Sequence, residues 1–145
     1  RGRGAIINIA SIVAIAPEIL NGVYGASKAY VQALSYSLHH ELKHKGIQIQ
    51  AVLPGATATD FWTAAGLPVE HLPSEIVMNA EDMVNAALVG FDRGELITIP
   101  SLHDLAEWEK FESARQALAQ KFGNDRPADR YLSTNQTQCS HSASA

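Results

Sequence analysis

The sequence predicts an α/β fold built on a mostly parallel sheet. Apolar runs at residues 4–10 and 47–53 are typical of strands, and the long stretch between them has the apolar spacing of a helix. Strands that alternate with helices in this way form βαβ units, in which neighbouring strands run parallel. A chain of 145 residues, 46% hydrophobic and 18% charged, is long enough for a packed core.

The first half of the chain predicts a strand, a helix and a strand. Residues 4–10 are apolar apart from Asn8, which predicts a strand buried on both faces that ends at Ser11. Residues 24–45 predict one long helix. Residues 47–53 predict the next strand, which Pro54 and Gly55 close. This second strand alternates more than the first, so we expect one of its faces to be less tightly covered.

The second half predicts shorter elements and a polar end. Residues 56–77 contain a glycine and two prolines, which predicts an irregular lid after the strand. A helix over residues 81–92, a strand over 95–99 and a helix over 102–121 follow. Residues 133–145 are rich in Ser, Thr, Asn and Gln and predict a disordered tail. The apolar residues of the last helix are expected on one face: Leu105, Trp108, Phe111 and Leu118.

Composition excludes several classes of function. The net charge is -4 and no basic cluster is present, which argues against nucleic acid. No apolar run has the length of a membrane span, so we expect no membrane partner. The single cysteine, Cys139, excludes an internal disulfide and is typical of a cytoplasmic protein. The chain begins with Arg1 and not with methionine, shortly before a strand, which suggests a fragment of a longer protein.

Ser11, Tyr24 and Lys28 form the strongest candidate for a catalytic site. Tyr24 and Lys28 are four residues apart on a predicted helix, so their side chains lie on one face. A cation one helical turn from a phenol stabilises the phenolate, which makes proton exchange easier near neutral pH. Ser11 ends a strand, where its hydroxyl could orient the substrate oxygen that a tyrosine protonates. The joint pattern predicts proton transfer.

Each of these residues also has a purely structural interpretation. Ser11 could be a turn residue, Tyr24 a core tyrosine, and Lys28 a lysine whose stem lies along apolar surface. Pro54 and Gly55 could simply stop a strand, although open α/β sheets bind ligands just past the carboxyl ends of their strands. The combination favours the catalytic interpretation. His71 and His103 lack a partner pattern and are interpreted as surface residues.

A second motif, His40-Glu41-Leu42-Lys43-His44, matches the His-Glu-x-x-His signature of zinc hydrolases. Two histidines four apart on a helix can share one metal ion. We expect no metal here, because these histidines lie opposite the apolar stripe and no third ligand has a suitable spacing. The stripe, which should face the sheet together with Tyr24 and Lys28, comprises Val31, Leu34, Leu38 and Leu42.

Taken together, the motifs resemble the second half of a short-chain dehydrogenase/reductase. The resemblance rests on the strand that ends at Ser11, on Tyr24-Gly25-Ala26-Ser27-Lys28, and on the strand followed by Pro54-Gly55-Ala56-Thr57-Ala58-Thr59. It is strong over residues 3–62, weaker beyond, and absent after residue 131. It implies that residues 1–132 are the C-terminal half of a doubly wound Rossmann-type domain, with three strands and flanking helices.

The same resemblance implies roles for individual residues. Tyr24 would be the general acid/base, Lys28 would assist it and bond the nicotinamide ribose, and Ser11 would hold the substrate oxygen. NAD or NADP is the implied cofactor, a small carbonyl or alcohol the substrate, and a homo-oligomer the complete protein. Further cofactor contacts are implied for Pro54, Gly55, Thr57 and Thr59, the family more often having an aliphatic residue where Thr57 stands. Phe61 and Trp62 would belong to the substrate lid.

The glycine-rich loop of the family and its catalytic asparagine have no counterpart in this sequence. We therefore expect the 145-residue chain to be inactive alone. Three alternatives to an oxidoreductase remain open: an epimerase or dehydratase of the same fold, which usually carries a larger C-terminal substrate region; a binding relative without activity; and a zinc hydrolase. Cofactor titration and metal analysis would separate the oxidoreductase from the zinc hydrolase.

Overall fold

The computed structural model describes residues 2–20, 22–64, 66 and 71–132. The chain forms two compact units, residues 1–103 and residues 104–145. The first unit contains the sheet and the helices that pack on it, and every residue with a predicted catalytic or cofactor-binding role lies there.

The sheet has three parallel strands in the order β1-β2-β3. β1 (Gly4–Ile9) pairs with β2 (Ile47–Val52) along its whole length, from Gly4 opposite Ile47 to Ile9 opposite Val52. β3 (Ile97–Thr98) is shorter than predicted and pairs only with the end of β2. The predicted α/β fold with a parallel sheet and flanking helices is confirmed.

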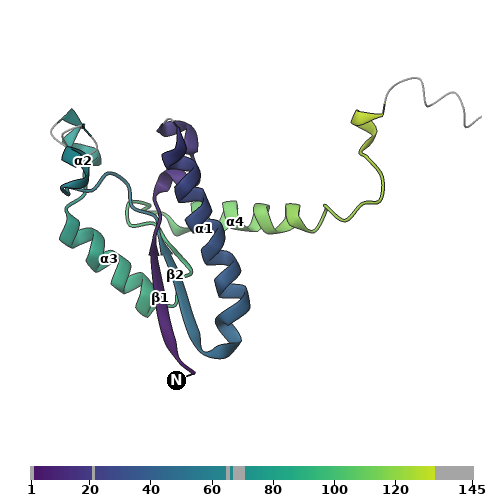
Figure 1. The fold of residues 1–145 in the computed structure, drawn as a ribbon, viewed down its shortest axis with the longest axis horizontal. Helices are drawn as coiled ribbons and strands as arrows, with labels where there is room; N and C mark the ends of the chain where they lie inside the picture. The colour runs from purple at the N-terminus through teal and green to yellow at the C-terminus, as the bar shows by residue number, and fades with distance from the viewer. Residues whose placement is uncertain (1, 21, 65, 67–70, 133–145) are drawn as a thin grey trace, which may run out of the picture. The chain divides into compact units, whose positions relative to one another are not determined.

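Two helices cover the two faces of this sheet. α1 (Val23–Leu42) contacts β1 and β2, and α3 (Ala80–Asp92) contacts β3. Figure 1 shows them on opposite sides of the strands. The side chains of β2 agree with this arrangement, because Gln48 and Gln50 both donate hydrogen bonds to carbonyls of α3 and successive side chains of a strand point to opposite faces.

α1 buries the predicted stripe only in part, because Val31, Leu38 and Leu42 are half-buried whereas other residues of the helix are buried more deeply. Its buried residues are Gly25, Gln32 and Ser35, whereas Leu34 is 37% exposed. Ser35 is fully buried because its hydroxyl donates to the Val31 carbonyl and accepts from the Asn8 amide of β1, at 2.8 and 3.0 Å. These small or hydrogen-bonded side chains let α1 pack closely on the strands. The spacing of apolar residues does not predict their burial, because two of them are polar and one is a glycine.

In this segment the burial of the first two strands differs from what their apolar patterns predict. Most of β1 is exposed, with Ile6 and Ile7 each 39% exposed, and full burial begins only at Ala10 and Ser11. Within the 145-residue chain β1 pairs with a strand on one side only, and α1 contacts it less than it contacts β2, so its side chains are less covered. β2 is the central strand and is buried from Ile49 to Val52 despite its glutamines.

Gln50 is accommodated inside the first unit by hydrogen bonds. Its Nε2 donates to the Ala87 carbonyl of α3 and to Thr98 Oγ1 of β3, both at 2.8 Å. Thr98 Oγ1 in turn donates to Glu95 at 2.8 Å. Gly90 of α3 packs directly on this cluster, because an added Cβ would collide with Thr98 Oγ1. The cluster joins α3 to β2 and β3, and Gln50 Oε1 has no hydrogen-bond partner within the described part of the chain.

The segment after β2 is irregular, as predicted, but partly ordered by backbone pairing. Thr57 forms an isolated parallel bridge with Met78, supported by hydrogen bonds from Ala58 N to Met78 O and from Met78 N to Ala56 O. α2 (Phe61–Ala64) and a 3-10 turn at Ser74–Ile76 lie between the two ends of this bridge. The bridge therefore holds the first residues of the predicted lid, residues 56–77, next to the residue that follows it.

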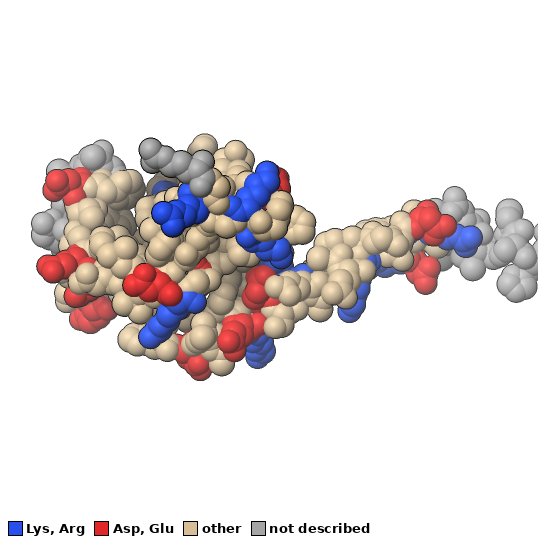
Figure 2. All heavy atoms as spheres, turned by 90° about the horizontal axis from the view of Figure 1, so that it is seen from below, with Lys and Arg blue, Asp and Glu red and all other residues tan. Residues whose placement is uncertain are grey.

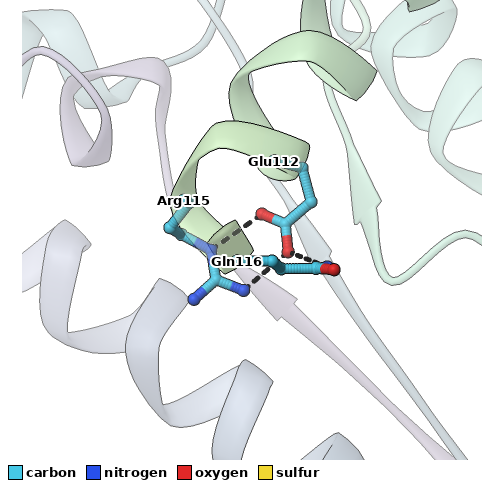
Figure 3. Close-up of polar contacts among 3 residues, drawn as sticks. All are labelled: Glu112, Arg115 and Gln116. Carbon is cyan, nitrogen blue, oxygen red and sulfur yellow. Dashed lines mark hydrogen bonds and ion pairs between the residues drawn. The ribbon is translucent and has the colours of Figure 1, made fainter. Parts of the chain in front are cut away.

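The second unit contains α4 (Leu105–Ala119), which is shorter than the predicted helix over residues 102–121. Asp104 caps it by accepting a hydrogen bond from Ala106 N. Glu112 binds Arg115 and Gln116 on its surface (Figure 3). None of its residues is buried. The predicted tail over residues 133–145, including Cys139, lies outside the described residues.

Charge is distributed without a single dominant sign on the face that Figure 2 presents. Basic and acidic side chains are interspersed there, and no large basic surface is seen. None of the helices in the described ranges is both long enough and apolar enough to cross a membrane.

Candidate active site

The predicted site lies where β1 and β2 end. Because the strands are parallel and in register, their carboxyl ends meet at the same edge of the sheet. The loops that follow are joined there: Ile12 N donates to the Pro54 carbonyl at 3.0 Å, and Ala10 N donates to Val52 O at 2.8 Å. Ser11 and the Pro54-Gly55 turn are therefore neighbours in space.

Ser11 is buried and caps a short 3-10 turn, Ile12–Ala14. Its hydroxyl donates to the Pro54 carbonyl and accepts from Val13 N, in both cases at 3.4 Å. These distances are at the long end for a hydrogen bond, so each is weak. Ser11 is thus a turn residue in the structure. Because both of its hydrogen bonds are weak, the hydroxyl could exchange one of them for a bond to another oxygen at low energetic cost.

Tyr24 and Lys28 lie on successive turns of α1, as predicted. Lys28 Nζ lies 5.6 Å from the centre of the Tyr24 ring and donates a hydrogen bond to the Ile9 carbonyl at 3.1 Å. Ile9 is the last residue of β1, two positions before Ser11. The strand end thus anchors the ammonium beside the phenol.

Gly25 explains how the first turn of α1 reaches this position. It is buried, and an added Cβ would lie 3.1 to 3.2 Å from atoms of Pro17, in the segment between β1 and α1. Such contacts are tighter than a side chain normally allows. A side chain at this position would therefore require Pro17 or the first turn of α1 to shift slightly.

An aromatic cluster lies beside Tyr24. The Phe61 ring of α2 is 5.9 Å from the Tyr24 ring and 5.6 Å from the Trp62 ring, which it meets edge-on at 78°. The Trp62 indole N–H donates to the Thr57 carbonyl at 2.7 Å. We call Phe61 and Trp62 the aromatic pair. It connects Tyr24 to the loop after β2, so the structure brings these lid residues to the predicted catalytic tyrosine.

The predicted cofactor-binding loop presents hydroxyls and backbone groups at the same sheet edge. Thr57 is buried and donates to the Gly55 carbonyl at 3.2 Å, whereas Thr59 is exposed and donates to the Thr57 carbonyl at 3.5 Å. A Cβ added to Gly55 would lie 3.5 Å from Ser101 Oγ, which is ordinary contact. Ser101 therefore belongs to this edge as well.

The His-Glu-x-x-His motif does not form one helical face. α1 ends at Leu42, and His44 lies in the 3-10 turn Lys43–Lys45 that follows. His40 and His44 are both exposed. In the part of the chain that the structure describes, no three or more His, Cys, Asp or Glu side chains are placed to hold a metal ion.

Sequence reasoning missed two contributors to the site. The Ile9 carbonyl, which holds Lys28, is a backbone group and leaves no signature in the sequence. Ser101 follows β3, and its position just past a strand end was the available signal, since the third strand had been predicted.

Comparison with known proteins agrees with this arrangement. Residues 1–68 match the family model for short chain dehydrogenases. The chain resembles the solved short-chain dehydrogenase from Sphingobium yanoikuyae in complex with NADPH, with a TM-score of 0.85 and 50% identity over 90% of this chain. It also resembles the bulky-bulky ketone specific alcohol dehydrogenase from Comamonas testosteroni, with a TM-score of 0.77 and 45% identity over 91% of this chain.

Among curated proteins, the very-long-chain 3-oxoacyl-CoA reductase of Rattus norvegicus is 39% identical over 88 residues, which are 61% of this chain and 26% of that protein. The chain covers 50% and 48% of the two solved structures, so it spans about half of their length. These matches identify residues 1–68 as part of a short-chain dehydrogenase domain.

Proposed function

We propose that the protein carrying this segment is an NAD(P)-dependent oxidoreductase that transfers hydride between the nicotinamide and a carbonyl or secondary alcohol. The observation that carries the proposal is the position of Lys28, which lies one helical turn from Tyr24 and is bonded to the last carbonyl of β1. Relatives support it, since one solved neighbour is in complex with NADPH and another is named a ketone specific alcohol dehydrogenase.

In the reducing direction, Tyr24 is the proton donor. As the carbonyl π bond breaks, a C–H bond forms at carbon and the Tyr24 hydroxyl supplies the proton to oxygen. The tyrosinate that remains is stabilised by the Lys28 ammonium and regains a proton from solvent. The Ser11 hydroxyl donates to the same substrate oxygen, exchanging its weak bond to Pro54 for a bond that strengthens as charge develops.

The donors at the sheet edge fit a nicotinamide nucleotide. A bound dinucleotide would supply the hydride. Lys28 can bond ribose hydroxyls, while the backbone of Pro54 and Gly55 and the hydroxyls of Thr57 and Thr59 suit a carboxamide, which both donates and accepts hydrogen bonds. Because the Thr57 hydroxyl donates to Gly55 O, its lone pairs remain available as acceptors. Either NAD or NADP is compatible with these residues.

Location and assembly are further parts of the proposal. The single cysteine in the sequence supports a reducing, cytoplasmic location. The face of α1 away from the sheet exposes apolar side chains, with Val23 84% and Tyr30 67% exposed. We expect this face to pack against its counterpart in a homo-oligomer, which light scattering of the full-length protein would test. A monomer at micromolar concentration would contradict it.

The proton-donor assignment is tested by Tyr24→Phe in the full-length protein. We expect turnover to fall by roughly 10²-fold to 10⁴-fold with the fold intact, because the proton donor is removed. Tyr30→Phe is the matched control, since Tyr30 is an exposed tyrosine on the same helix. Lys28→Met should lower turnover and also weaken NADPH binding. Normal turnover in the Tyr24 variant would remove this residue from the mechanism.

The 145-residue chain alone is expected to bind dinucleotides weakly. Only the nicotinamide-end loop and Lys28 would hold the cofactor, which is too few contacts to offset the immobilisation of a large flexible ligand. Calorimetric titration with NADH and NADPH measures this directly. Micromolar affinity together with a cooperative thermal melt would show that this segment is a functional unit.

A further inference from the structure

We propose that the aromatic pair, Phe61 and Trp62, makes the site selective for ketones that carry an aromatic ring next to the carbonyl group. This inference rests on the proposed function, because it names the substrate class of the same site. Phe61 is the residue that contacts the substrate ring, and Trp62 is a positioning residue that holds Phe61.

The position of Trp62 is fixed from the backbone. Its indole N–H donates to the Thr57 carbonyl at 2.7 Å, a short and therefore well-formed bond. Thr57 is itself buried and belongs to the bridge with Met78, which is flanked by two backbone hydrogen bonds of 2.8 and 2.9 Å. The indole is thus tied to a point of the loop after β2 that is held by backbone pairing.

The position of Phe61 follows from its two aromatic neighbours. The edge-on contact with Trp62 at 5.6 Å and the tilted contact with Tyr24 at 5.9 Å are both within the range of favourable ring pairs. Despite these two contacts the side chain remains 48% exposed. A phenylalanine held on two sides therefore still presents free ring surface next to the proposed proton donor.

The chemistry of this surface selects the substrate. A substrate whose carbonyl oxygen reaches the Tyr24 hydroxyl places its flanking group close to the same ring that Phe61 contacts. An aromatic flanking group can stack on Phe61 in an offset or edge-on geometry, whereas a methyl group buries far less apolar area there. Because the ring contact is the same in the ground state and the transition state, it acts on KM and leaves kcat unchanged.

The test compares two ketones in the full-length enzyme with NADPH and with NADH. Acetophenone carries an aromatic ring next to the carbonyl group, and 2-butanone does not. For Phe61→Ala we expect the kcat/KM of acetophenone to fall about tenfold through KM, and that of 2-butanone to change less than about threefold. Phe61→Leu, which keeps an apolar side chain of similar size, should give an intermediate loss for acetophenone.

Trp62→Phe tests the positioning role, because it keeps a ring but removes the N–H that binds Thr57. We expect a higher KM for acetophenone, by roughly threefold to tenfold, with kcat for 2-butanone unchanged. Phe111→Ala is the matched control. Phe111 is 45% exposed and lies 5.3 Å from Trp108 in a similar ring pair on α4. This control should leave the ratio of the two kcat/KM values unchanged.

The outcomes separate this inference from the proposed function. If the wild type reduces both ketones and Phe61→Ala changes both kcat/KM values equally, the aromatic selectivity is wrong and the oxidoreductase proposal stands. If Trp62→Phe lowers kcat for both ketones without a change in KM, Trp62 does not act through Phe61. If the wild type reduces no ketone or aldehyde with either cofactor, the proposed function fails, and the selectivity fails with it.

Discussion

β1 and β2 are strands of equal length that pair residue for residue, yet they lie in opposite environments. The strand with three isoleucines is largely exposed, whereas the strand with two glutamines is buried over its last four residues. Ile6 and Ile49, which are register partners, are 39% and 1% exposed. In the 145-residue chain, which spans about half the length of its solved relatives, the burial of each strand reflects the elements that this segment packs around it.

The neighbours can be named for each face. Asn8 of β1 bonds Ser35 of α1, so Ile6, two residues earlier, points toward the same face of the sheet as α1. α1 nevertheless packs mainly over β2, whose carboxyl half it covers. On the other face, Gln50 is enclosed by α3 and β3, and its register partner Ile7 lies beyond them at the edge.

The largest expected effect is at the buried glutamine. Gln50→Glu would place a carboxylate against the Ala87 carbonyl in a fully buried position, and we expect a loss of about 3–5 kcal/mol in the free energy of unfolding. Protonation of the new carboxyl restores a donor, so the loss should be smaller at pH 5 than at pH 8. Urea denaturation at both pH values measures it.

Gln48→Glu is the control for this prediction. Gln48 also donates to a carbonyl of α3, that of Phe91, but it is only partly buried. Its replacement should cost clearly less than that of Gln50. Equal losses at the two positions would mean that burial by α3 and β3 does not distinguish them.

A second prediction compares the two isoleucines that face each other in the register. Ile49→Ala should cost ~2–5 kcal/mol, because it leaves a cavity in the core, whereas Ile6→Ala should cost about 1 kcal/mol in the 145-residue chain. The family resemblance implies that another part of the full-length protein covers β1. In the full-length protein we therefore expect Ile6→Ala and Ile49→Ala to lower the free energy of unfolding by similar amounts. Unfolding of both lengths in urea tests this, and a persistent difference would argue that β1 remains an edge.

The smallest effect on stability is expected at the exposed side of β1. Ile7→Lys should change the free energy of unfolding by less than about 1 kcal/mol, because Ile7 is already 39% exposed. A lysine on an edge strand opposes pairing with another chain, so the substitution should reduce self-association of the 145-residue chain in light scattering. Ile76→Lys, at a side chain 59% exposed outside the sheet, is the control. Equal reductions in both variants would exclude the β1 edge as the cause.

The parallel sheet and the candidate site just past the ends of its strands could be predicted because they follow from local patterns. Short apolar runs on either side of a long helical pattern are typical of a βαβ unit. Parallel pairing then places the residues that follow both strands at one edge of the sheet. The structure shows this for Ser11 and Pro54, which follow β1 and β2 and lie within hydrogen-bond distance of each other. Tyr24 and Lys28 share a helix face by spacing alone.

Tertiary structure decided what local patterns leave open. Which strand lies at the edge, which face of α1 meets the sheet and where Lys28 finds its acceptor all depend on contacts between residues distant in sequence. Ser35 and Gln50 are polar and yet fully buried, because the Ser35 hydroxyl accepts from Asn8 of β1 and Gln50 Nε2 donates to α3 and β3. Hydrophobicity predicts the transfer of a side chain out of water, but only the surrounding elements determine whether a polar side chain is compensated.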